Sequence, residues 1–510
     1  MATAELQSGQ GTTGIPAPES TDSKFDYPGI PTTCDGAEAV VWVETHVAQG
    51  SGAYPITSST TMGAGFNLAV NNGKPNLWGE QLVFVEPESE HSAATFCEGF
   101  AAAGGRVTNF TSGQGLVLMK EVLYTISGKR LPVVFNIGAR ALTSQGLNVH
   151  AGHDDVMSVA DVGWGMLFAR NAQEAGDLCL ISRRAAEASQ TPFLNVQDGF
   201  LTTHTVESVR LSEPEFMKEF IGSPNEKLVN LMDPENPLMS GVVQNQDSYM
   251  KGKIAQRTWY DKCAPALQDA FDEFYRQTGR KYGFVDAYRC DDADFIIVGM
   301  GCYMETAQTT VDYLRDEKGI KAGCLNIYCF RPFPAKSIVD ALRNCQAFTV
   351  IERMDDPLST TGNHLTREIK AAFCDAMDGR GGHEKLDKLP RIYHGAAGLG
   401  SRDVRPGDLI AIFENMRHDG QEFFCVGIKH PLALQQAEDP DLRPPGGFSM
   451  RGHSVGGFGS VTTNKVIATI GGQVFGKDVQ AYPKYGSEKK GLPTTYYLTI
   501  ADTHIYTHSE

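Results

Sequence analysis

From Asp35 onward the sequence alternates between apolar runs and turns punctuated by glycine, and this alternation constrains the fold most strongly. The runs read in turn as amphipathic helices and as buried strands. Helices that alternate with buried strands indicate a parallel sheet covered on both faces, so we predict an α/β fold. In the first half, we expect helices over 37–48, 92–103 and 172–188, and strands over 81–85, 131–137 and 191–196.

Changes of composition divide the chain into a tail and three units. At about 150 residues per domain, 510 residues make roughly three domains. Residues 1–30 are rich in Gly, Ser, Thr and Pro, which predicts a flexible tail. The segment 222–252 is rich in Pro and Asn and reads as a long connection. The units that we expect are 31–262, 263–404 and 405–510.

The later units contain the same kinds of element. The second has a leading helix over 264–277, further helices over 305–314 and 364–374, and strands over 295–298, 325–328 and 347–351. The third, from about Arg405, differs in composition: it is glycine-rich over 446–459, helical over 462–470 and extended over 494–500.

Charge restricts the function. Lys and Arg number 45 and Asp and Glu number 61, so the formal net charge is −16. An acidic protein is poorly suited to nucleic acid or an anionic membrane as main partner, since binding phosphate needs the opposite field. No apolar run reaches the roughly 18–20 residues of a membrane helix. Residues 1–25 show no signal or transit peptide, and we expect a cytoplasmic enzyme.

Cysteine spacing argues against a metal cluster held by this chain. The 11 cysteines lie in apolar contexts, as reduced, buried thiols do. Cys324 and Cys329 are the closest pair, and no C-x-x-C occurs. The sequence therefore contains no recognisable zinc ribbon or cluster-binding run, and another chain would have to hold any iron–sulfur cluster.

Two motifs favour ordinary structural interpretations. Gly299-Met300-Gly301 follows a strand and opens a helix, but Met304 stands where a dinucleotide-binding motif has its third glycine, so we expect a tight turn. The H-x-x-H-D-D run of 150–155 has metal-ligating residue types, but it matches no ligand set carried on a helix. We expect a surface or active-site loop there and no metal.

A third group of residues indicates a site. Thr57 lies in a loop that follows a strand, Glu86, Glu88 and Glu90 follow the next strand, and Arg140 follows a third. Parallel sheets place their sites at the ends of their strands. A hydroxyl, an acid and a cation that meet there could orient a carboxylate substrate and protonate a cofactor nitrogen; solvated acids in a loop are the alternative.

The glycine-rich run 450–459 precedes a helix and could expose backbone N–H groups. Arg451 and Lys465 add positive charge, so the run is a candidate cradle for a phosphate or pyrophosphate. A glycine turn required by packing is the alternative.

Over most of residues 31–500 the sequence resembles the pyruvate:ferredoxin oxidoreductases, which depend on thiamine diphosphate. The first domain is matched by TTCDG (32–36), YPIT (54–57), EPESE (86–90), TSGQGLVLM (111–119), VVFNIGARAL (133–142), DGF (198–200) and GRKYG (279–283). The second is matched by FRPFP (330–334) and GLGSRD (398–403), and the third by RGHSVGGFGS (451–460) and PKYGSEKKG (483–491). The resemblance implies a pyrimidine-type thiamine diphosphate domain, a domain with the transketolase C-terminal fold, and a partial gamma-type domain.

The resemblance also implies residue roles. Glu90 would contact the aminopyrimidine ring, where an acid favours the imino tautomer that removes the C2 proton of the cofactor. Thr57 and Arg140 would hold the 2-oxo acid, with Arg140 pairing with its carboxylate. Arg451, Ser454 and Lys465 would contact coenzyme A. The implied reaction is the oxidative decarboxylation of a 2-oxo acid, most simply pyruvate, to an acyl-CoA and CO2.

The resemblance further implies a partner. The chain ends at Glu510, within the family's third domain. We therefore expect a second chain that binds the cofactor's diphosphate with Mg and carries the iron–sulfur clusters. Ferredoxin or flavodoxin would accept the electrons, and the assembly would be a dimer of heteromers.

Several positions depart from the family pattern. Ser58 replaces a proline, Gly138 a threonine, Gly152 an aspartate and Leu201 an arginine, and 160–162 reads Ala-Asp-Val where Arg-Gln-Thr is common. Loss of these arginines changes the charge near the substrate. Two alternatives remain: a non-catalytic scaffold or assembly protein derived from this family, and a thiamine enzyme that decarboxylates without oxidation.

Overall fold

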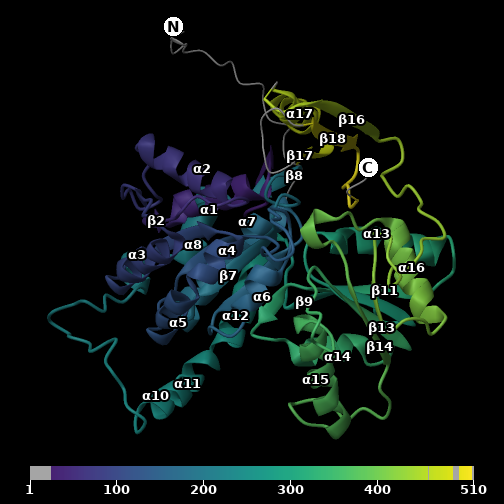
Figure 1. Ribbon diagram of the computed structural model, residues 1–510. Helices are drawn as coiled ribbons and strands as arrows, with labels where there is room; N and C mark the ends of the chain where they lie inside the picture. The colour runs from purple at the N-terminus through teal and green to yellow at the C-terminus, as the bar shows by residue number, and fades with distance from the viewer. Residues whose placement is uncertain (1–23, 458, 486–492, 508–510) are drawn as a thin grey trace, which may run out of the picture.

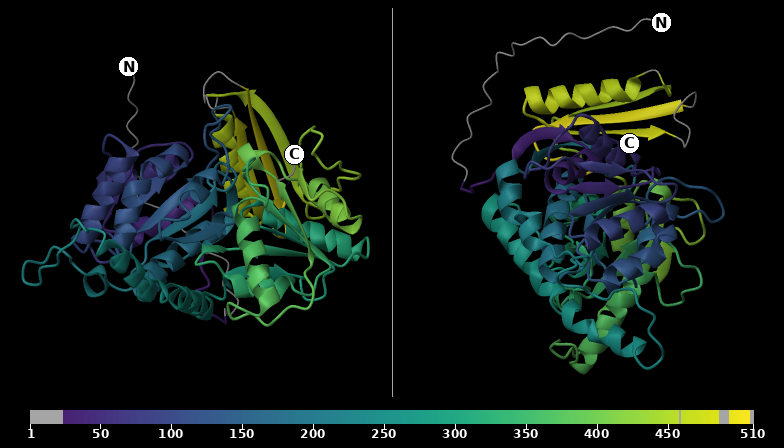
Figure 2. Two further views of the ribbon diagram at one scale, coloured as in Figure 1. Left: turned by 60° about the horizontal axis from the view of Figure 1, so that its bottom comes forward. Right: turned by 90° about the vertical axis from the view of Figure 1, so that its left-hand side faces the viewer.

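The computed structural model describes residues 24–457, 459–485 and 493–507 and contains three sheets. Figure 1 shows the first unit on the left, the second on the right, and the third, in yellow, above both. Figure 2 shows the strands and helix of this last part lying as a separate layer on the first two units. The tail expected over 1–30 lies outside the described residues as far as residue 23.

The first sheet has seven strands in the order β12-β6-β7-β5-β4-β2-β3. All neighbouring pairs are parallel except β12 with β6. Its strands are β2 (Gly50–Gly52), β3 (Val83–Val85), β4 (Val107–Thr111), β5 (Val134–Ala139), β6 (Gly165–Ala169), β7 (Phe193–Asp198) and β12 (Cys329–Arg331). The predicted parallel sheet is confirmed, although β12 reaches it from the second unit.

Helices cover both faces of this sheet. They are α1 (Gly36–Val47), α2 (Thr60–Asn71), α3 (Glu90–Ala102), α4 (Gly113–Leu118), α5 (Lys120–Gly128), α6 (Asp154–Ser158), α7 (Ala172–Ser189), α8 (Pro214–Ile221) and α12 (Cys263–Thr278). The side chains of Asp35, Ser89 and Asn171 accept N–H groups at the starts of α1, α3 and α7, as good N-caps do. Within the described residues, no helix is long and apolar enough to span a membrane.

The expected long connection is confirmed. Between α8 and α12 lie only α9 (Pro224–Lys227), α10 (Tyr249–Ala255) and α11 (Arg257–Tyr260), and Figure 1 shows this segment extending away from the body of the first unit.

The second sheet has the order β15-β14-β13-β10-β11-β9, and only β9 is antiparallel to its neighbour. The strands are β9 (Val285–Tyr288), β10 (Phe295–Gly299), β11 (Ala322–Ile327), β13 (Ala347–Glu352), β14 (Arg391–Ala396) and β15 (Phe423–Cys425). The helices are α13 (Tyr303–Asp316), α14 (Ala335–Leu342), α15 (His364–Asp378) and α16 (Pro406–Arg417). The structure places β15 in this sheet, and α16 packs on β10 and α13, whereas the sequence assigned residues after 404 to the third unit.

The third sheet is antiparallel, in the order β1-β8-β17-β18-β16. It comprises β1 (Ile30–Cys34), β8 (Val206–Leu211), β16 (Phe448–Val455), β17 (Asp478–Tyr485) and β18 (Pro493–Ala501), and α17 (Ser460–Thr469) packs on it. Two of its strands come from the first 262 residues, so the third unit extends a sheet begun by the first. The run 450–459 is a candidate phosphate cradle, with a glycine turn as the alternative. Its residues 450–455 belong to strand β16, which pairs with β18 along its whole length.

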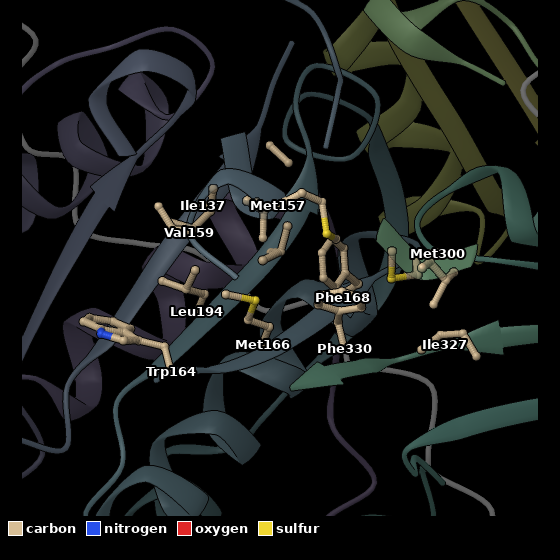
Figure 3. Close-up of a cluster of buried hydrophobic side chains, with 14 of the residues drawn as sticks. Ile137, Met157, Val159, Trp164, Met166, Phe168, Leu194, Met300, Ile327 and Phe330 are labelled. Carbon is tan, nitrogen blue, oxygen red and sulfur yellow. The ribbon is translucent and has the colours of Figure 1, made fainter. Parts of the chain in front are cut away.

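The largest hydrophobic core crosses from the first unit into the second. Figure 3 shows Phe168 beside Phe330, which comes from β12, with Leu194 of the first unit on one side of them and Met300 and Ile327 of the second unit on the other. All five side chains are almost completely buried. Because this apolar surface is shared, the two units hold each other in a fixed arrangement.

Candidate active site

Thr57, Glu90 and Arg140 lie at the carboxyl edge of the first sheet. Thr57 lies in the loop after β2, Glu90 is the first residue of α3 after β3, and Arg140 directly follows β5. Since these three strands are parallel, their carboxyl ends meet at one edge. The topology therefore places all three residues at one edge of the sheet.

Arg140 contacts Thr57 directly. Its Nη1 donates a hydrogen bond to the Thr57 carbonyl oxygen. The Arg140 side chain passes over Gly113, where an added Cβ would lie 3.0 Å from both its Cδ and its Nε. Gly113 has φ of +54° and leaves the room that this guanidinium stem needs.

Arg140 is only 5% exposed. Burial lowers the pKa of Arg140 from its usual value, and the negative charge of Asp155 opposes that shift. Among the described residues, its buried Nε has no hydrogen-bond partner. A nearly buried guanidinium with an unused donor is suited to a carboxylate ligand.

Glu90 lies against Gly115, which is in the first turn of α4, two residues after Gly113. A Cβ added at Gly115 would lie 2.7 Å from the Glu90 Cγ and 2.7 Å from the Thr111 Oγ1. Glu90 is half-buried, and within the described residues the buried Thr111 hydroxyl has no hydrogen-bond partner. A carboxyl group and a hydroxyl that the described residues leave unpaired lie close together here, and such groups suit the polar edge of a nitrogen heterocycle such as the aminopyrimidine of thiamine diphosphate.

Two of the departures from the family pattern touch each other. The Ser58 hydroxyl donates to the Gly138 carbonyl oxygen at 3.2 Å, and the Ser112 hydroxyl donates to the same oxygen at 2.6 Å. A Cβ at Gly138 would lie 2.9 Å from the Ser58 Oγ, so this pair is matched in size.

The other departures lie in different surroundings. A Cβ at Gly152 would lie 2.6 Å from the Ala141 backbone, so no side chain fits there. Asp161 accepts from the Tyr124 hydroxyl and pairs with Lys120, both on α5, at 2.7 and 2.9 Å. Leu201 is half-buried in the turn after β7.

The four side chains of the H-x-x-H-D-D run do not converge on one point. His153 donates through Nε2 to Asp198, at 2.8 Å, while Asp154 accepts the Leu142 N–H. Asp155 accepts backbone N–H groups. The His150 ring instead lies against Phe200 of the DGF motif, with 4.8 Å between ring centroids and 47° between the ring planes. Within the described residues, no group of three or more His, Cys, Asp or Glu residues could hold a metal ion.

Sequence reasoning missed a buried ionic network that joins the first two units. Asp198, at the end of β7, accepts hydrogen bonds from His153 and from the Cys302 N–H at 2.8 Å. It also forms an ion pair with Arg353, whose Nε lies 3.3 Å from its Oδ1. Gly301, in the expected tight turn, approaches the same carboxylate: an added Cβ would lie 2.4 Å from its Oδ2. The only signal in the sequence was an Asp and an Arg that each follow an apolar strand.

The three residues expected to contact coenzyme A lie on the third sheet and its helix. Arg451 is exposed on β16, over the Tyr497 ring, and Ser454 contacts Ser460. Lys465 pairs with Asp35 at 2.7 Å and so ties α17 to the start of α1. The structure thus brings Arg451 and Ser454 onto one strand but gives Lys465 a structural partner.

A cavity of about 410 Å³ lies beside the GLGSRD motif and was not predicted. Its lining includes the cations Arg402, Arg405, Lys429 and Lys484 and the acids Asp403 and Asp408. The motif residue Arg402 and the strand residue Lys484 bring the second unit and β17 together around this cavity.

Three family models match the chain. Residues 45–272 match the model described as pyruvate flavodoxin/ferredoxin oxidoreductase, thiamine diphosphate-binding. Residues 293–409 match pyruvate:ferredoxin oxidoreductase core domain II, and residues 449–510 match pyruvate ferredoxin/flavodoxin oxidoreductase.

Curated relatives agree with these models. The pyruvate-flavodoxin oxidoreductase of Nostoc sp. (strain ATCC 29151 / PCC 7119) is 33% identical over 415 residues, which are 80% of this chain and 99% of the relative. That of Trichormus variabilis is 32% identical over 482 residues, 93% of this chain and 40% of the relative. The pyruvate:ferredoxin oxidoreductase of Moorella thermoacetica is 31% identical over 480 residues, with the same coverage. The chain therefore spans 40% of the length of the relatives that match 93% of it.

A solved structure has a similar fold. It is a 2-oxoglutarate:ferredoxin oxidoreductase from Magnetococcus marinus with 2-oxoglutarate, coenzyme A and succinyl-CoA bound. The TM-score is 0.57 at 17% identity, and the match covers 76% of this chain and 66% of the other. The fold and the matched models define an α/β protein of the thiamine diphosphate-binding oxidoreductase class. The chain belongs to the pyruvate:ferredoxin/flavodoxin oxidoreductase family, as the motifs predicted.

Proposed function

We propose that this chain is the substrate-binding part of a thiamine diphosphate-dependent 2-oxo acid:acceptor oxidoreductase, with pyruvate as substrate and coenzyme A as acyl acceptor. Two contacts at the start of α4 carry this proposal: Arg140, bonded to Thr57, lies against Gly113, and Glu90 lies against Gly115. Family membership supports it, since the named relatives are pyruvate oxidoreductases.

Each of the three residues has a distinct task in this proposal. Arg140 would bind the substrate carboxylate, for which its buried, unpaired Nε is an additional donor. Thr57 holds Arg140 through its carbonyl oxygen, which leaves its hydroxyl to contact the 2-oxo group. Glu90 would donate a hydrogen bond or proton to a ring nitrogen of the cofactor. When bound, thiamine diphosphate would supply the nucleophilic carbon and the electron sink that these side chains lack.

Other polypeptide would complete the active site. Iron–sulfur clusters need thiolate ligands, and the 510 residues contain no C-x-x-C. We therefore propose a partner chain that grips the cofactor's diphosphate through Mg, holds the clusters and passes electrons to ferredoxin or flavodoxin. A dimer of such heteromers would place two active sites in one particle.

Coenzyme A would bind near the second and third units. The cavity beside Arg402 and Lys484 is lined by four cations and two acids, and this excess of positive charge suits a phosphate-bearing ligand. Arg451 and Ser454 on β16 remain candidates for further contacts, whereas Lys465 would first have to leave its ion pair with Asp35.

The test is pyruvate- and coenzyme A-dependent reduction of a dye by the chain purified with its partner. Glu90→Gln should lower kcat by about 100-fold or more, in line with the loss of a general acid. Glu98→Gln on the same helix is the matched control, because Glu98 pairs with Lys129 and not with the residues around Gly115. A Glu90→Gln complex as active as the parent would show that the acid is misassigned.

The same assay separates the alternatives. A parent complex that neither reduces dye nor releases CO2 would favour a non-catalytic scaffold. CO2 release without dye reduction would favour decarboxylation without oxidation.

A further inference from the structure

Asp155 lies in the candidate site but outside the sequence motifs that carry the family resemblance. It is fully buried on the short helix α6. Its Oδ2 accepts two backbone N–H groups from different segments, that of Gly113 at 2.8 Å and that of Arg140 at 3.0 Å. Its Oδ1 accepts the N–H of Val156 at 2.8 Å. All three hydrogen bonds are given to one carboxylate.

The two segments joined by Oδ2 are the two halves of the site. Arg140 belongs to the half that also contains Thr57. Gly113 opens α4, and Gly115, in the first turn of the same helix, lies against the Glu90 side chain. Among the described hydrogen bonds, these two are the ones that join the backbone after β5 and the start of α4 through a single atom.

We infer that Asp155 is a positioning residue, whose carboxylate sets the distance between the substrate-binding Arg140 and the helix start that supports Glu90. The inference rests on the proposed function, because it assigns the two halves to substrate and cofactor. Asp155 acts through the backbone of Gly113 and Arg140 and is not itself placed against the reacting atoms.

The chemistry of the carboxylate fits this role. An ionised aspartate is an acceptor only and can receive several N–H groups at fixed angles. Burial raises the pKa of Asp155 to about 7, and the three N–H donors oppose that shift. A fully buried carboxyl that meets backbone donors from two strand-end loops therefore holds those loops in register.

Amide hydrogen exchange on the full chain tests the tie without any enzymatic activity. In Asp155→Ala, exchange at the Gly113 and Arg140 amides should rise by about tenfold or more, because both donors lose their acceptor. Asp155→Asn should restore protection at both, since its amide oxygen can occupy the Oδ2 position, although its NH2 group then faces the Val156 N–H, which loses its acceptor. Unchanged exchange at Gly113 and Arg140 in Asp155→Ala would overturn the inference.

Asp177→Ala is the matched control. Asp177 is also a buried carboxylate of the first unit, but its partners are Arg280 and Tyr282, outside the site. It should leave exchange at Gly113 and Arg140 as in the parent chain, so a rise there equal to that in Asp155→Ala would mean only general loosening and would overturn the inference.

Kinetics of the assembled enzyme give the second readout. Asp155→Ala should raise KM for pyruvate by about tenfold and weaken thiamine diphosphate binding, whereas Asp155→Asn should stay within about threefold of the parent. If Asp155→Ala does not fold, the asparagine variant still decides, because a large rise in its KM would show that charge, rather than the tie, matters. An inactive parent complex would refute the proposed function alone, and the exchange experiment would still decide on the tie.

Discussion

Replacing Asp198 by asparagine would remove the negative charge at the junction of the first two units. Asp198 and Arg353 are each 1% exposed, and the carboxylate also accepts from His153 and from the Cys302 N–H. Either orientation of an asparagine amide would turn its NH2 group toward at least one of these donors. The variant would therefore lose a hydrogen bond and leave the Arg353 guanidinium buried without its counter-charge.

The size of the effect follows from that burial. Removing one partner of a buried ion pair costs about 3–5 kcal/mol, whereas an exposed pair contributes about 0–1 kcal/mol. At roughly 2–4 °C per kcal/mol for a cooperative unit of 150–250 residues, the melting midpoint should fall by about 6–20 °C. Asp340→Asn is the control, because Asp340 forms an exposed pair with Lys336 and should change the midpoint by less than about 4 °C.

The stabilisation by Asp198 should depend on pH in one direction. Burial would raise the pKa of Asp198, but Arg353 and His153 outweigh it and hold that pKa well below its usual range. The stabilisation is therefore present above the unfolded pKa of about 4 and is lost as the pH falls below it. Thermal unfolding followed by circular dichroism at pH 7 and pH 3 measures both effects. An Asp198→Asn midpoint at pH 7 no lower than that of Asp340→Asn would refute the reasoning.

Three further predictions concern other parts of the chain. Gly138→Ala should cost about 1–3 kcal/mol in the free energy of unfolding, because its Cβ would lie 2.9 Å from the Ser58 Oγ. In a Ser58→Ala background, urea titration should show a smaller cost, and equal costs would contradict the contact. Burial lowers the pKa of His504, but its acidic partners raise it to about 9. Protonated His504 should therefore add about 1–2 kcal/mol to the free energy of unfolding below pH 6.5, a value kept small because solvent screens a side chain that is 38% exposed. This contribution should be lost as the pH rises to 9. A pH series on His504→Gln that keeps the parent's slope would contradict this. Gly115→Ala should displace Glu90 and weaken thiamine diphosphate binding to the assembled enzyme by about tenfold or more, measured by calorimetry; unchanged affinity would contradict the placement of Glu90.

The sequence was sufficient where structure follows from local pattern. Apolar periodicity and turn residues predicted α1, α7 and β5 to within a few residues, because these elements have strong local signals. The positions of Thr57, Glu90 and Arg140 after separate strands then placed them at one edge, since parallel strands share their carboxyl ends.

Pairings between distant segments could not be predicted in the same way. Strand β12 joins the first sheet although it follows β11 of the second, and β8 pairs with β17 across more than 250 residues. Strand β16 has the sequence FSMRGHSV, in which only Phe448 and Val455 have high strand propensity, and pairing with β18 fixes its conformation. Pairing of this kind depends on which edges the rest of the fold leaves open.

By itself, then, the sequence determined the family, the parallel sheet of the first unit and the chemistry of the side chains at the ends of its strands. Only the tertiary structure decided which polar groups became buried together. In the sequence, Asp155 and Asp198 look like ordinary acids. In the fold both are buried between segments that are far apart in the chain: Asp155 joins Gly113 to Arg140 within the site, and Asp198 joins the first unit to Arg353 of the second. The physical reason is that a carboxylate's energy depends on the donors and dielectric around it, and these are properties of the folded surroundings.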